Sequence, residues 1–118
     1  MALHNTLGVD GEYLAAEWLK NKEYQILHRN WRHSHFEIDI IASKNKMLHF
    51  VEVKCRNASP FGFPEDSVTK KKFKNLKMAA DEFLFRNPGH RWIQYDILSI
   101  TLYKNKEPDF FLLEDVFL

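Results

Sequence analysis

Two short acidic stretches, Glu37–Asp39 and Glu52–Lys54, carry the residue types that could do chemistry in this sequence. Both lie in otherwise apolar runs that predict the two strands of a hairpin, so Asp39 and Glu52 can lie side by side. Carboxylates on neighbouring strands repel each other unless a cation lies between them. Mg²⁺ or Mn²⁺ would take such oxygen ligands, and Lys54, on the same strand face as Glu52, could contact the same ligand.

A purely structural interpretation fits the same residues. The period of two along a strand places Glu37 and Asp39 on one face, with Ile38 and Ile40 on the opposite face. Lys54 could then form a cross-strand ion pair with Asp39 or Glu37 on a solvated side of the sheet. Spacing alone leaves this interpretation open beside the metal site.

Helical and extended patterns predict the elements that must position these residues. Apolar residues from Leu7 to Leu19 recur at helical spacing, with Asn5 or Thr6 as the cap and Glu12 at the edge of the buried face. A second helix is expected from Glu65 or Ser67 to Phe85. Strands are expected over 25–32, 36–42, 47–55, 92–103 and 110–113. This order predicts an α/β fold with a central mixed sheet flanked by helices.

The composition limits the class of protein. With 118 residues, of which 45% are hydrophobic, the chain is expected to form a single domain over residues 1–118. Its one cysteine, Cys55, excludes an internal disulfide. No apolar run approaches the roughly 20 residues of a membrane span, and the first residues lack the pattern of a signal peptide. We therefore expect a cytoplasmic protein that has no membrane partner.

Charge is segregated although the net charge is only +1. Residues 54–77 hold seven Lys or Arg against two acidic residues, a local charge of +5, whereas residues 107–118 hold four acidic residues and no basic one. Arg29, Arg32 and Arg56 flank the predicted site and are the better candidates for binding phosphate, because guanidinium binds it bidentately. On the second helix, Lys72 points toward the margin of the apolar face and is a secondary candidate. Lys70, on another line with Lys74 and Lys77, either faces solvent or contacts DNA phosphates.

A set of short motifs runs through most of the chain: Gly11-Glu12-x-x-Ala15, Arg29-Asn30-x-Arg32, Glu37-Ile38-Asp39-Ile40-Ile41, Phe50-Val51-Glu52-Val53-Lys54-x-Arg56, Phe61-Gly62-x-Pro64 and Val68-x-x-x-Lys72. Asp39 followed by Glu52-x-Lys54 resembles the Asp…Glu-x-Lys signature of the PD-(D/E)XK nuclease superfamily. The whole set resembles the YraN family of small bacterial proteins within that superfamily.

The resemblance implies a restriction-endonuclease-like fold close to that of Holliday-junction resolvases. It implies that Asp39 and Glu52 bind the metal, that Lys54 is the catalytic lysine and that Glu12 is an additional acid. The chain departs from the family pattern at three positions. Phe36 replaces a usual glycine, Cys55 a common threonine and Gln94 a common arginine.

The resulting expectation is a Mg²⁺- or Mn²⁺-dependent nuclease of the bacterial cytoplasm that hydrolyses phosphodiester bonds of DNA. Branched or damaged DNA is the candidate substrate, and the resolvase-like relatives imply a homodimer. Two alternatives stand beside it. One is a module of the same fold that binds nucleic acid without cutting it, and the other is an adaptor that uses its aromatic residues to bind partners.

Overall fold

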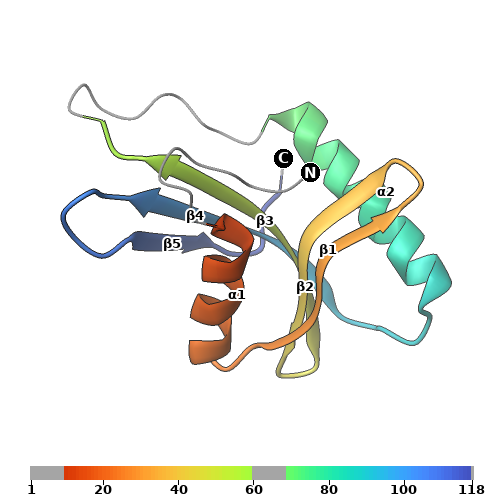
Figure 1. Cartoon of the computed structure of the whole chain (residues 1–118). Helices are drawn as coiled ribbons and strands as arrows, with labels where there is room; N and C mark the ends of the chain where they lie inside the picture. Colours follow the sequence, from red (N-terminus) through yellow and green to blue (C-terminus); the bar gives the residue numbers. More distant parts are fainter. Residues whose placement is uncertain (1–9, 60–68, 118) are drawn as a thin grey trace.

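The computed structural model describes residues 10–59 and 69–117, which form two helices and a five-stranded sheet (Figure 1). The strands lie in the order β1-β2-β3-β4-β5, with β3 and β4 parallel and the other neighbours antiparallel. The elements in chain order are α1 (Gly11–Asn21), β1 (Gln25–His33), β2 (Phe36–Lys44), β3 (Met47–Asn57), α2 (Lys70–Arg86), β4 (Ile93–Leu102) and β5 (Asp109–Leu113).

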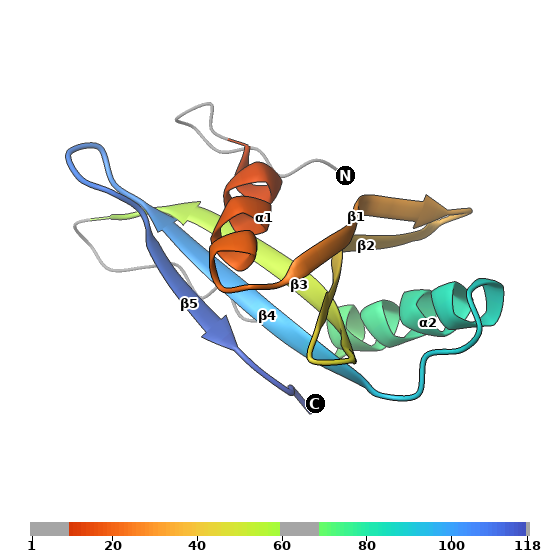
Figure 2. The ribbon, with the colours of Figure 1, turned by 90° about the horizontal axis from the view of Figure 1, so that it is seen from below.

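The sheet separates two apolar cores, each covered by one helix (Figure 2). On one face, Ala15, Ala16 and Leu19 of α1 pack against β2, β3 and β4. On the other face, α2 packs its buried side, including Phe73 and Phe83, against β2 and β3. The predicted α/β class with a mixed sheet and flanking helices is confirmed, and the arrangement is consistent with a restriction-endonuclease-like fold. Neither of the two described helices has the length and apolar character needed to cross a membrane.

The start of α1 differs from the sequence prediction. Asp10 caps the helix, and its carboxylate accepts hydrogen bonds from the backbone N–H groups of Glu12 and Tyr13, at 3.0 and 3.2 Å. The expected cap, Asn5 or Thr6, lies outside the described residues. The Asp10 carboxylate satisfies N–H groups that the first helical turn leaves without partners. Glu12 therefore stands in the first turn of α1.

The predicted hairpin of β2 and β3 is confirmed. The strands are joined by Asn45 and Lys46, whose φ angles of 52° and 66° are those of a tight two-residue turn. The second helix, α2, begins after Thr69, whose side chain accepts a hydrogen bond from the backbone N–H of Lys72 at 3.2 Å. Its expected start at Glu65 or Ser67 lies outside the described residues.

β2 does not keep a regular alternation of faces. The side chain of Ile38 belongs to the core under α2, whereas the side chain of Ile40 belongs to the core under α1. The expectation that Ile38 and Ile40 share a face is therefore wrong. The physical reason is a kink at Asp39, opposite Asn30 of β1, where the backbone of Asn30 has a φ of 52°.

The kink separates the first part of β2 from β3. Pairing between the two strands runs from Lys44 to Ile40 and stops there. Beyond that point, the backbone N–H of Val53 donates a hydrogen bond to the side chain of Asp39, at 2.9 Å. Figure 1 shows β2 curving away from β3. The two strands thus form a fork, and a carboxylate lies at the point where they separate.

Candidate metal centre

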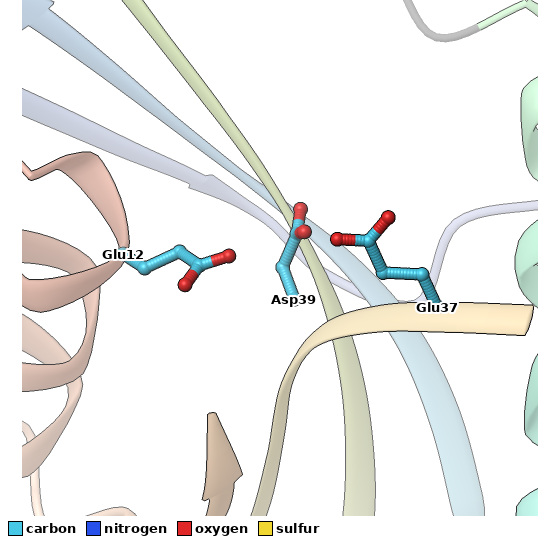
Figure 3. A group of neighbouring side chains, drawn as sticks. All are labelled: Glu12, Glu37 and Asp39. Carbon is cyan, nitrogen blue, oxygen red and sulfur yellow. The ribbon is translucent and has the colours of Figure 1, made fainter. Parts of the chain in front are cut away.

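Three carboxylates meet at the fork between β2 and β3. Glu12 reaches it from α1, and Glu37 and Asp39 reach it from β2 (Figure 3). One oxygen from each lies within 4.8 Å of the other two. Glu12 is 5% exposed and Asp39 7% exposed, while Glu37 is half-buried. Such a group of oxygen ligands can hold a hard divalent cation.

The carboxylate of Glu12 lies in an unusual environment. Its Oε2 atom is buried and accepts no hydrogen bond from any residue in 10–59 or 69–117. A buried polar atom left in this state costs about 1–3 kcal/mol, and more when it carries charge. The neighbouring acids increase this cost, because Figure 3 shows Glu12 directed toward Asp39. A cation between these groups would remove the cost.

Burial and the neighbouring acids raise the pKa values of Asp39 and Glu12. Burial, together with the charge of Glu52, raises the pKa of Asp39 to about 7, although the hydrogen bond from Val53 opposes the change. Burial also raises the pKa of Glu12, with further contributions from Asp39 and Asp10, while Arg29 lowers it. Both effects have the direction expected when the charged form of an acid is desolvated among other acids.

Glu52 faces a cleft of about 510 Å³ on the α2 side of the fork. Lys54 and Lys72 also line this cleft, and Glu37 stands at the edge shared with the carboxylate cluster. Burial raises the pKa of Glu52, and the charges of Lys54 and Lys72 oppose this effect. Glu52 therefore lies within electrostatic reach of two cationic groups and of Asp39.

The structure places the four residues predicted from the sequence in two adjoining groups, Glu12 and Asp39 in the carboxylate cluster and Glu52 and Lys54 in the cleft, and adds Glu37 to the first. Asp39 connects the carboxylate cluster with the cleft, because it lies beside Glu12 in the cluster and also interacts electrostatically with Glu52. Glu52 itself is not a member of the three-carboxylate group. Glu37 was expected only as an ion-pair partner for Lys54. Its position two residues before Asp39 was the available signal, but its convergence with Glu12 depends on how α1 and β2 pack together.

The five basic residues expected to bind nucleic acid are spread more widely. Arg29 forms an ion pair with Asp10, and Arg32 forms one with Glu37, each at 3.3 Å. Arg56 lies toward the end of β3, opposite Thr101 of β4. Of the five, Lys72 alone lines the cleft, and Lys70 is exposed at the first position of α2.

Fold and site together define an α/β protein whose sheet forks at a buried cluster of carboxylates. The model of a family described as uncharacterised protein family UPF0102 matches residues 11–100, and the chain belongs to this family. This result confirms the resemblance to the YraN family seen in the sequence motifs.

Relatives from several bacteria match most of the chain. A UPF0102 protein of Bacteroides fragilis is 42% identical over 100 residues, which cover 85% of this chain and 83% of the relative. One of Flavobacterium psychrophilum is 42% identical over 107 residues, covering 91% and 88%. One of Rhodococcus jostii is 35% identical over 119 aligned positions, covering 99% and 100%. The chain thus spans nearly the full length of these relatives.

Proposed function

We propose that this protein is a metal-dependent nuclease that hydrolyses phosphodiester bonds of DNA. The observation that carries the proposal is the buried Glu12 carboxylate, whose Oε2 lacks a hydrogen-bond donor among the described residues while two further carboxylates converge on it. Two lysines line the adjoining cleft, next to Glu52. Metal-dependent hydrolysis of a phosphodiester uses carboxylates to hold a divalent metal ion and positively charged side chains to bind the phosphate. Residues of both kinds lie next to each other here.

The chemistry of the donor set fits Mg²⁺ or Mn²⁺. The candidate ligands are all carboxylates, which hard divalent ions prefer, and no histidine or cysteine belongs to the cluster formed by Glu12, Glu37 and Asp39. Glu52 adds a further carboxylate next to Asp39. When bound, such an ion polarises a phosphate and makes a water molecule more acidic.

The protein's own residues supply the remaining requirements. The hydrogen bond from Val53 fixes the orientation of the Asp39 carboxylate, as supporting contacts do for metal ligands in general. The ammonium group of Lys54 stands close enough to Glu52 to change its pKa. From there it can hold the attacking water or stabilise the charge that builds up on the phosphoryl oxygens. Lys72, on the α2 side of the cleft, supplies a second positive charge that orients the phosphate.

Cleavage assays on a panel of substrates test this proposal. Linear duplex, single-stranded, flap and four-way DNA are incubated with Mg²⁺, with Mn²⁺ or with a chelator. We expect cutting that requires the metal and that is greatly reduced in Glu12→Gln and Lys54→Ala. A matched control is Glu17→Gln, which changes a glutamate of the same helix whose side chain is 44% exposed, and which should cut like the parent.

The result also separates the proposal from a module that only binds nucleic acid. A parent protein that binds DNA and divalent metal, yet cuts no structure in the panel, would establish the binding module instead. Cutting that continues unchanged in Glu12→Gln would show that the carboxylate cluster is not the site.

A further inference from the structure

The cleft beside Glu52 has an apolar wall that metal chemistry does not need. Phe36, Leu76 and Met78 line it, together with His35 and Asn75. Its volume of about 510 Å³ falls within the range of about 300–1,000 Å³ that is typical of small-ligand sites. The cleft therefore combines positive charge, from Lys54 and Lys72, with flat or polarisable apolar groups.

The apolar wall is suited to a planar ligand. The rings of His35 and Phe36 are in contact, with centroids 4.3 Å apart and planes tilted by 33°. Phe36 also packs at the margin of the core under α2, which limits its freedom to move. Met78 is 44% exposed and presents a polarisable thioether to the cleft. An aromatic ring held in this way can stack with any nucleobase.

We infer that the cleft seats one unpaired nucleotide, with its base against Phe36 and Met78 and its phosphate toward Lys54 and Lys72. A base inside a duplex is stacked on both faces and cannot enter a pocket of this kind unless it is extruded. The substrate class is therefore single-stranded nucleic acid, or a duplex that contains an unpaired nucleotide. The inference rests on the proposed function for the hydrolysis of that phosphate, but not for the seating of the base.

The position of Asn75 supports the same occupant. Asn75 lines the cleft from α2, one turn after Lys72. Its amide carries both donors and an acceptor, which can pair with the edge of a base that has lost its Watson–Crick partner. The cleft thus holds the three kinds of group that a nucleotide would use: cations for the phosphate, an aromatic ring for stacking and an amide for the edge of the base.

Binding measured in a chelator tests the inference without any cleavage. Fluorescence anisotropy compares a labelled DNA single strand, the matching RNA strand, a blunt duplex and the same duplex with one unpaired nucleotide. We expect the parent to bind the single strands and the interrupted duplex at least about tenfold more tightly than the blunt duplex. Phe36→Ala and Met78→Glu should weaken single-strand binding by about five- to a hundredfold. Phe85→Ala, which removes an aromatic side chain of α2 that is 82% exposed and does not line the cleft, should bind like the parent.

A base analogue gives an independent readout. The fluorescence of 2-aminopurine falls when the base stacks, so a strand that carries it should dim on binding to the parent and dim less on binding to Phe36→Ala. If Phe36→Ala does not fold, Met78→Glu decides, because Met78 is partly exposed and a charge there enters the cleft without disturbing the core.

Failure of the inference is distinguishable from failure of the proposed function. Equal affinity for single strand and blunt duplex, or parent-like binding by both variants, would overturn the inference. Metal-dependent cutting of continuous duplex by Phe36→Ala and Met78→Glu at the parent's rate would also overturn it, while leaving the nuclease intact. A strong preference for unpaired nucleotides without cutting would support the cleft as a seat for a nucleotide and refute the nuclease.

Discussion

Asp96 and Asp39 are buried acidic residues of the same sheet, but the groups around their carboxylates differ in kind. Asp96 of β4 is fully buried, and its Oδ2 lies 2.7 Å from Nδ1 of His49. Its other oxygen accepts hydrogen bonds from the side-chain amide of Gln94 at 2.8 Å and from the backbone N–H of Asp115 at 3.0 Å. Asp39, in contrast, receives a backbone hydrogen bond from Val53 and otherwise faces acids.

The contrast distinguishes Asp96, whose carboxylate stabilises the fold, from Asp39, whose surroundings favour a bound cation. The donors around Asp96 compensate its burial and fasten the segment after β5 to the sheet, where the backbone N–H of Val116 also donates to the carbonyl of Tyr95 at 2.8 Å. Nothing comparable compensates the crowding of Glu12 and Asp39 among the described residues. A buried polar cluster that is fully hydrogen-bonded stabilises a fold, whereas one left partly unsatisfied indicates a missing partner.

The largest expected effect is on stability, at Asp96. Asp96→Ala removes the acceptor for His49, Gln94 and the backbone of Asp115, and we expect it to lower the free energy of unfolding by about 3–5 kcal/mol. Urea denaturation measures this, with Glu107→Ala at an exposed acid as a control that stays within about 0.5 kcal/mol of the parent. If Asp39→Ala destabilised the metal-free protein as much as Asp96→Ala, the distinction between the two acids would fail.

The next effect is on the rate of cleavage, under the proposed function. Lys54→Ala should lower kcat by about 10²–10³, because it removes one preorganised charge that acts in the transition state. Affinity for Mn²⁺ should change little, since lysine is not a ligand. Lys104→Ala, an exposed lysine between β4 and β5, serves as the control. Equal losses of rate and of metal affinity would instead assign Lys54 to the assembly of the metal site.

A third expectation concerns pH. Asp39 has a pKa of about 7 in the folded protein against an ordinary value of 3.8, so the folded state binds the extra proton between these values. The free energy of unfolding without metal should therefore fall, by about 2–4 kcal/mol, as the pH rises from about 4 to about 7. Asp39→Asn keeps an acceptor for Val53, should flatten this dependence and should be more stable than the parent at about pH 8. Stability that rises over the same range would contradict the unfavourable burial of Asp39.

The smallest effect is expected at the exposed start of α2. Lys70→Ala should weaken nucleic-acid binding modestly and equally for all sequences, because a phosphate contact carries no base information. The slope of log affinity against log salt should decrease by about one. Anisotropy titrations at several salt concentrations measure this. An unchanged slope would place Lys70 outside the binding surface, which would then be confined to the cleft.

The elements could be predicted from the sequence because their signals are local. Alternating apolar residues and a short polar connection define the hairpin of β2 and β3, and the apolar stripe containing Phe73 and Phe83 defines α2. The true cap of α1 was missed, since Asn5 and Thr6 fit the capping rule as well as Asp10 does.

The geometry of the site could be predicted only in part. The spacing of Asp39, Glu52 and Lys54 placed the acids on adjacent strands, but the period of two assumes an unbroken strand. The kink opposite Asn30 breaks that period and places Ile38 and Ile40 in different cores, and Glu37 of β2 converges with Glu12 of α1. The kink lies where β2 pairs with β1, and the apolar pattern of β2 taken by itself does not reveal it.

The central claim is that the carboxylates of Glu12, Glu37 and Asp39 hold a divalent cation, and thermal unfolding tests it most directly. At about pH 8, millimolar Mg²⁺ or Mn²⁺ should raise the Tm of the parent in a saturable way, corresponding to about 2.7 kcal/mol when the metal reaches a hundred times its Kd. Glu12→Gln should show a much smaller rise, and sodium chloride of equal ionic strength should not reproduce the effect. A parent Tm that does not respond to either metal, or that rises equally in Glu12→Gln, would contradict the claim.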